Sequence, residues 1–192
     1  MISKKTILLL ALGTLVVFGG IGIVLIPYVR NIEISTFLFG IESLWLQVLI
    51  GISFGIVTAM AGWQIVELPQ MTKIKRFFVE LISPIKLSKS QIVFISICAG
   101  VGEELLFRGA IQPVLGIWIT SILFVLLHGY LNPFNLQLTF YGIYMVFVIG
   151  VMGLMTEHLG ILTAMIAHTL IDVILLRKLS ATSLSDEKKN GD

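Results

Sequence analysis

The sequence has 192 residues, of which 57% are hydrophobic and 12% are charged. Ordinary soluble domains have roughly 45–50% apolar and about 25% charged residues, so this chain has more apolar surface than a soluble fold can bury. The net charge is only +2 and no basic patch is interleaved with aromatic residues, so nucleic acid is excluded as an expected partner. The single cysteine, Cys98, excludes a disulfide within the chain. These features predict an integral membrane protein.

Six apolar segments predict a polytopic bundle, because a helix of about 20 apolar residues crosses the hydrocarbon core of a bilayer. They are residues 7–29, 37–66, 92–115, 116–130, 136–156 and 161–176. The first is longer than a signal-peptide core and lacks a small-x-small cleavage site, so we expect it to be a retained helix. The second is long enough to require a tilted or overlong helix. The predicted fold class is all-α, a transmembrane bundle of about six helices.

We expect one membrane-embedded domain at residues 1–179, with a motif-bearing core at 92–176 and a polar, disordered tail at 180–192. Residues 67–91 combine basic and apolar side chains between the breakers Pro69 and Pro84, which predicts a cytoplasmic amphipathic segment at the membrane surface. This segment either only sets the topology or also binds anionic lipid or the juxtamembrane part of a substrate. Glu157 and His158 are expected in a solvated turn outside any site.

The basic residues also orient the bundle, because cytoplasmic loops concentrate lysine and arginine. With six crossings and an inside N-terminus, only Arg30 faces outside, and both termini are cytoplasmic in a multi-pass protein of the cell membrane. The residues then placed inside are Lys4, Lys5, Lys73, Lys75, Arg76, Lys86, Lys89, Arg177, Lys178, Lys188 and Lys189.

Ionisable side chains within the apolar segments are the functional candidates, because a charge at the bilayer centre costs about 2.5–3.5 kcal/mol on insertion scales. Glu104 and Arg108 are four residues apart in the acid-first order, so we expect them to form an ion pair within one helix. Glu103 lies about 100° around the helix from Glu104. It is therefore left as the available carboxylate, suited to act as a general base.

Two further pairs have the same helical spacing, Phe124 with His128 and His168 with Asp172. A carboxylate, two imidazoles and a further polar oxygen can then converge inside the bundle, which supplies the base, proton shuttle and donors that peptide hydrolysis needs. The alternative is a polar network that only holds the helices together. A straight-helix layout puts Glu103 as much as about 10 Å deeper than His128, so a tilted helix or a different boundary is required.

Small residues near these groups predict close helix contacts in the same region. Gly100, Gly102 and Gly109 flank the two glutamates and the arginine. Glycine lets two helix backbones approach closely inside a membrane. We therefore expect the third apolar segment to pack tightly against its neighbours.

Together, the motifs resemble the CPBP family, which comprises type II CAAX-prenyl-endopeptidase-like and bacteriocin-processing membrane proteins and is called Abi in bacteria. The resemblance rests on Glu-Glu-x-x-x-Arg at 103–108, Phe-x-x-x-His at 124–128 and His-x-x-x-Asp at 168–172. It covers roughly residues 92–176 and is strengthened by the string Glu-Glu-Leu-Leu-Phe-Arg-Gly.

The resemblance implies a glutamate-dependent intramembrane endopeptidase that acts on a membrane peptide or protein within the lipid bilayer. Glu103 would activate water together with His128, while His168 and Asp172 would bind the oxyanion or the substrate. The supporting residues would be Glu104, Arg108 and Phe124. The alternatives left open are a non-catalytic scaffold or bacteriocin self-immunity protein that retains the polar cluster, and a small transporter with a proton relay.

No cofactor is expected. Zinc or another divalent metal at Glu103, His128, His168 and Asp172 ranks second, because the chain has no His-Glu-x-x-His helix. Asp172 stands where many relatives have asparagine, and an ionised aspartate cannot donate a hydrogen bond. Asp172 must therefore be protonated to serve an oxyanion, or else its function is to orient His168.

Overall fold

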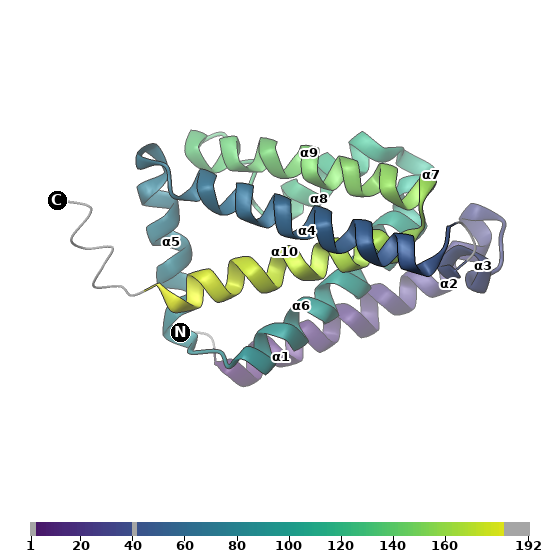
Figure 1. The fold of residues 1–192 in the computed structure, drawn as a ribbon, viewed down its shortest axis with the longest axis horizontal. Helices are drawn as coiled ribbons and strands as arrows, with labels where there is room; N and C mark the ends of the chain where they lie inside the picture. Colours follow the sequence, from purple (N-terminus) through teal and green to yellow (C-terminus); the bar gives the residue numbers. More distant parts are fainter. Residues whose placement is uncertain (1–2, 40–41, 183–192) are drawn as a thin grey trace.

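The predicted all-α fold is confirmed by a computed structural model, which describes residues 3–39 and 42–182 and in which every regular element is helical (Figure 1). The elements are α1 (Lys4–Gly13), η1 (Thr14–Phe18), α2 (Gly19–Arg30), α3 (Ile34–Phe39), α4 (Leu44–Val66), η2 (Pro69–Met71), α5 (Thr72–Ile82), η3 (Ser83–Ile85), α6 (Lys89–Glu104), η4 (Leu105–Ile111), α7 (Gln112–Leu115), α8 (Ile117–Leu127), α9 (Leu136–His158) and α10 (Ile161–Ala181).

Several of the described helices are long and apolar enough to cross a membrane, so the protein is a multi-pass membrane protein. Four meet both criteria: Lys4–Arg30, Leu44–Val66, Lys89–Leu115 and Leu136–His158. Helix α10 adds 21 residues, which extend about 32 Å and match a hydrocarbon core of about 30 Å. The predicted overlong span at 37–66 is wrong, because α3 ends at Phe39 and α4 begins after Ser43, whose side chain accepts a hydrogen bond from the Leu46 amide.

The prediction that residues 116–130 form a helix that crosses the whole membrane is wrong. Helix α8 has 11 residues and extends about 16 Å, roughly half of the hydrocarbon core. Gly129 ends it with φ +76°, while the Gly129 amide donates to Leu126 O and the Tyr130 amide donates to Val125 O. These two bonds form a Schellman motif, which needs a residue that tolerates the left-handed conformation. The helix therefore stops part-way across the bundle.

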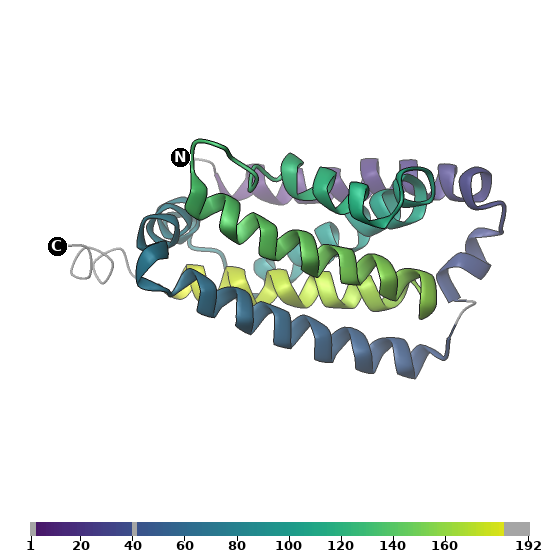
Figure 2. The same ribbon diagram turned by 90° about the horizontal axis from the view of Figure 1, so that it is seen from above.

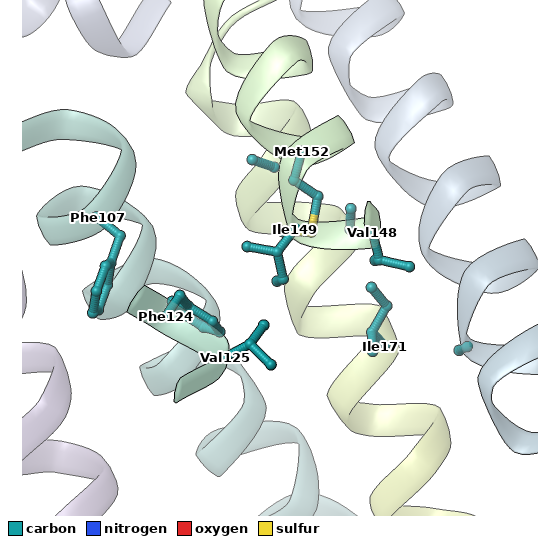
Figure 3. Close-up of a cluster of buried hydrophobic side chains, with 10 residues drawn as sticks. Phe107, Phe124, Val125, Val148, Ile149, Met152 and Ile171 are labelled. Atoms are coloured by element: carbon teal, nitrogen blue, oxygen red, sulfur yellow. The ribbon is translucent and has the colours of Figure 1, made fainter. Parts of the chain in front are cut away.

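Helix α10 runs through the middle of the bundle and packs against α4, α6 and α9 (Figure 2). A buried apolar cluster fills the space between α8, α9, α10 and the π-helical segment η4 (Figure 3). It includes Phe107, Phe124, Val125, Val148, Ile149, Met152 and Ile171. Phe124 is thus held in the protein interior, which fixes the helix that leads to His128.

The glycines predicted to allow close helix approach do so. A Cβ at Gly102 would lie 2.7 Å from Thr14 O, and one at Gly109 would lie 2.5 Å from Ile26 Cδ1. A Cβ at Gly100 would overlap the Thr169 hydroxyl of α10. Side chains at these positions would push α6 and η4 away from η1, α2 and α10, so the predicted close helix contacts are confirmed.

The two ends of the bundle differ in the elements that they contain. The start of α1, the helix α5 and the end of α10 gather at one end, and α3 and α7 lie at the other (Figure 1). Helix α5 is flanked by the 3-10 turns Pro69–Met71 and Ser83–Ile85, as the two prolines predicted. The inside orientation of this end stays a prediction.

The predicted tail boundary lies mostly beyond what the structure describes. Helix α10 continues to Ala181, so the first two residues assigned to the tail are helical. The rest of the tail, with Lys188 and Lys189, lies outside the described residues apart from Thr182.

Gly51→Ala is expected to destabilise the protein by about 1–3 kcal/mol, the usual cost of overpacking. Its Cβ would lie 2.8 Å from Thr163 O and 3.0 Å from Ile166 Cβ, so α4 and α10 would have to separate. Gly20→Ala is the matched control, because nothing lies within 4 Å of a Cβ there. Melting temperatures in detergent should fall for Gly51→Ala and hold or rise for Gly20→Ala. Equal melting temperatures would contradict this account of the α4–α10 contact.

Candidate active site

Glu103 and His128 lie at the same depth because each is about equally far along its helix from the turn that joins α7 to α8. Gly116, with φ +78°, joins α7 to α8. Glu103 lies 12 residues before Leu115, or about 18 Å along the helix, and His128 lies 11 residues after Ile117, or about 17 Å. The observed distance from His128 Nε2 to Glu103 Oε2 is 3.6 Å. The straight-helix layout is therefore wrong, and the different boundary that the sequence analysis required is found at the end of α8.

Glu103 presents a buried oxygen atom that has no hydrogen-bond partner among the described residues. This atom is Oε2, and the Glu103 side chain is 13% exposed. His128 Nε2 lies 3.6 Å from it and His168 Nε2 lies 3.9 Å from it, both longer than a direct hydrogen bond. Helices α6 and α10 and the end of α8 thus aim three side chains at one point.

The two imidazole rings are oriented by bonds on their other nitrogen. His128 Nδ1 lies 2.8 Å from Phe124 O, and the His128 ring stacks on the Phe124 ring at 4.3 Å and 24°. His168 Nδ1 lies 2.8 Å from Glu104 Oε1. A carbonyl or carboxylate oxygen only accepts, so each Nδ1 is the donor. In its neutral form, each ring therefore turns the lone pair of Nε2 toward Glu103.

Two imidazole lone pairs and a carboxylate oxygen face one another here. All three are acceptors, and acceptors that face one another repel. A donor between them removes the conflict, either as a proton on one ring or as a water molecule. The space nearest to the two rings is a cavity of about 60 Å³ that both histidines line, while Glu103 Oε2 is buried beside it.

The predicted ion pair is confirmed. Arg108 Nε donates to Glu104 Oε2 at 3.0 Å, and both side chains are fully buried. The other oxygen of Glu104 accepts from His168, so one carboxylate links the arginine to the imidazole. Asp172 Oδ2 is 3.8 Å from His168 Nε2, which is too long for a hydrogen bond. Glu104 thus accepts the hydrogen bond that orients His168, a function that the sequence analysis gave to Asp172 as one of two alternatives.

Two small cavities adjoin this cluster. One of about 60 Å³ is lined by His128, His168 and Asp172 together with apolar and tyrosine side chains. Another of about 110 Å³ lies between Trp63, Phe78 and the end of α10. Both are lined by Tyr130, Tyr141, Asp172 and Leu175. Asp172 therefore lies between the cavity beside the two histidines and the cavity beside α5.

Several polar residues near the cluster were missed by the sequence analysis. Arg30 was expected only to face outside, but its Nη2 lies 2.8 Å from Glu157 Oε1. Glu157 is in the last turn of α9 and not in a free turn. Gln112 is 2% exposed and lies four residues after Arg108, a spacing that would have identified it.

The absence of a metal cofactor stays a prediction, and a metal site stays the second hypothesis. Among the described residues, no group of three or more His, Cys, Asp or Glu side chains is arranged to hold a metal ion. The Nδ1 bonds of His128 and His168 leave both Nε2 atoms free, an orientation that suits a metal ligand as well as a partner of a water molecule. The proposed reaction below uses only the side chains themselves.

Comparison with known proteins identifies the segment that carries the cluster. Residues 86–174 match the family described as Type II CAAX prenyl endopeptidase Rce1-like. The chain is also 36% identical over 92 residues to the "Uncharacterized protein YpbD" of Bacillus subtilis (strain 168), a match that covers 46% of each chain. No solved structure matches. The resemblance predicted from the motifs is thus confirmed, over nearly the same residues.

Proposed function

From the Rce1-like family match over residues 86–174, we propose that this protein is an intramembrane endopeptidase that hydrolyses a peptide bond of a membrane-associated peptide or protein. One observation carries the proposal. Glu103 Oε2, which has no hydrogen-bond partner among the described residues, faces two imidazole nitrogens whose rings are oriented by hydrogen bonds on the other nitrogen. Such a group is arranged to bind and deprotonate a water molecule.

The proposed reaction begins with a water molecule held by Glu103 Oε2 and His128 Nε2. Glu103 takes one proton, and the water oxygen attacks the carbonyl carbon of the scissile bond. The oxyanion that forms faces His168 and Asp172, which stabilise it when they carry a proton to donate. As the carbon–nitrogen bond breaks, the proton held by Glu103 passes to the leaving amine. The products are a carboxylic acid, which then loses its remaining proton to solvent, and an amine, so one water is consumed.

The short helix α8 supports this proposal, because hydrolysis needs water at membrane depth. Backbone that is not helical at this depth is tolerated where it is buried in protein or lines a water-filled cavity. Residues 128–135 form such a non-helical segment directly after α8, and His128 is 35% exposed there. We propose that water enters the cluster along this segment, because a backbone with free polar groups needs water at that depth.

Hydrolysis is tested by the origin of the oxygen in the product. Purified protein is incubated in lipid nanodiscs with membrane peptides from cells that lack it, in water enriched in ¹⁸O, and new C-termini are read by mass spectrometry. We expect new C-terminal carboxylates that carry one ¹⁸O atom and that are absent with Glu103→Gln. A scaffold or a transporter produces no such termini, so their absence with wild-type protein would reject the proposal.

Chelation tests the second hypothesis, in which a divalent metal such as zinc is needed for cleavage. After exhaustive treatment with EDTA and removal of the chelator, we expect cleavage to continue at a rate within about twofold of the untreated rate. Water activation by Glu103 needs no metal in the proposed reaction. If cleavage is lost after chelation and returns on adding Zn²⁺, the metal reading replaces the glutamate mechanism.

A further inference from the structure

A continuous chain of polar contacts leads from Glu104 toward the end of the bundle opposite α5. Arg108 Nη1 donates to Gln112 Oε1 at 3.2 Å. Gln112 Nε2 in turn donates to Gly153 O at 3.1 Å and to Glu157 Oε1 at 2.7 Å. The Gln112 amide thus has a definite orientation, with its oxygen toward the arginine and its nitrogen toward α9.

Arg30 of α2 fixes the outer end of this chain. It donates from Nη1 and Nη2 to the Glu157 carboxylate at 3.1 Å and 2.8 Å, a bidentate pair. It also donates to the carbonyl oxygens of Arg108 and Gly109, at 2.7 Å and 3.1 Å. Those carbonyls belong to the π-helical segment η4, which carries Arg108 itself. The same arginine therefore holds both the backbone of Arg108 and the carboxylate that orients Gln112.

The position of the Arg108 guanidinium depends on Gln112. Arg108 is fully buried, and its Nη2 has no hydrogen-bond partner among the described residues. Without Gln112, Nη1 would lose its acceptor as well, and a buried guanidinium with unpaired nitrogens is costly. Glu104 already accepts from Arg108 Nε through Oε2, and its Oε1 is occupied by His168. A bidentate Arg108–Glu104 pair would then compete with His168 for that oxygen.

We propose that Gln112 is a positioning residue of the endopeptidase: it holds Arg108 away from Glu104 Oε1 and so keeps that oxygen on His168 Nδ1. The inference rests on the proposed function, since it assigns Gln112 to the reaction through His168. Gln112 touches no reacting atom. The pair formed by Arg30 and Glu157 anchors it from the far side.

The test compares Gln112→Met with Gln47→Met. Gln47 is also fully buried, donates to Glu42 O from α4 and has no place in the chain of contacts. Both substitutions remove one buried amide and keep a side chain of similar length. The sequence has only three histidines, so ¹⁵N-histidine labelling in detergent gives few signals, which His→Gln variants assign.

We expect wild-type His168 to show the Nδ1-protonated form and Gln112→Met to shift its signals, while Gln47→Met leaves them unchanged. With a cleaved peptide in hand, Gln112→Met should lower kcat at least about tenfold with little change in KM, because misplacing a catalytic group by about 1 Å costs on the order of 100-fold. A wild-type His168 spectrum in Gln112→Met would overturn the proposal. The spectrum needs no substrate, so this result is separate from a failure of the proposed function.

An exchange of side chains provides a second test. Gln112→Glu alone places a second carboxylate at the 2.7 Å contact with Glu157 and should impair both the His168 signals and cleavage. Adding Glu157→Gln restores an amide donor next to a carboxylate and keeps an acceptor for Arg108. We expect the double exchange to recover at least half of the wild-type kcat. Glu157→Gln alone is the control, because it also ends the ion pair with Arg30. If this control is active and the folded double variant is no more active than Gln112→Glu, the proposal is overturned.

Discussion

Glu103→Gln is expected to lower kcat by about 10²–10⁴-fold, the usual contribution of a general base, and to leave the amount of folded protein unchanged. Glutamine is nearly isosteric with glutamate but does not take a proton from water. No hydrogen bond to Oε2 is lost, because that atom has no partner among the described residues. The new amide can even donate to His128 Nε2, so we expect the melting temperature to stay the same or to rise.

The measurement is cleavage of an identified peptide beside the melting temperature in detergent. Glu67→Gln is the matched control, since it makes the same chemical change at an exposed position at the end of α4. Loss of activity without loss of stability is typical of a residue whose position serves function at the expense of stability. Turnover by Glu103→Gln at the wild-type rate would reject the glutamate mechanism.

Hydropathy predicted where the apolar segments lie, but it predicted the ends of the helices less well. Composition alone locates the segments, because a membrane imposes a nearly fixed length of apolar helix. It did not show that α8 ends at Leu127, since Phe124, Val125 and Leu126 are as apolar as a full crossing requires. Gly129 is the residue in the sequence that indicates the end of α8. A glycine that terminates a helix through a Schellman motif outweighs the hydropathy of the residues around it.

The candidate site was predictable where its contacts are local to one helix. A spacing of four residues gave the Glu104–Arg108 pair directly, and the same spacing applied once more gives Gln112. The bond from Glu104 to His168 joins residues 64 positions apart, and the bond from Arg30 to Glu157 joins residues 127 positions apart. Such contacts depend on how α2, α6, α9 and α10 pack, which no periodicity within one helix reveals.

These contacts give the two adjacent glutamates different functions, although they share a chemical group and a helix. Glu103 faces the two Nε2 atoms with an oxygen that no described residue bonds, whereas both oxygens of Glu104 accept hydrogen bonds from charged or polar donors. A buried carboxylate with all its acceptors satisfied stabilises the fold, and one with an unpaired oxygen is free for chemistry. The Glu103→Gln and Glu104→Gln proteins should therefore differ in stability.

Glu104→Gln is expected to destabilise the protein by about 3–5 kcal/mol, because it leaves the fully buried Arg108 without a counter-charge. It also weakens the bond that orients His168, so cleavage should fall together with the melting temperature. Removing both charges with Glu104→Gln and Arg108→Gln should restore part of the stability, as expected for coupled residues. Arg108→Gln alone should be destabilised as well.

The double variant separates the two functions of Glu104. If Glu104 only balances Arg108, stability and cleavage should recover together when both charges are removed. If it also positions His168, as the 2.8 Å contact indicates, the melting temperature should recover while kcat stays at least about tenfold below wild type. Melting temperature, kcat and the His168 signals are measured for the four proteins of this cycle. A Glu104→Gln variant that is as stable as wild type but inactive would contradict the structural function of Glu104 and leave the proposed function of Glu103 intact.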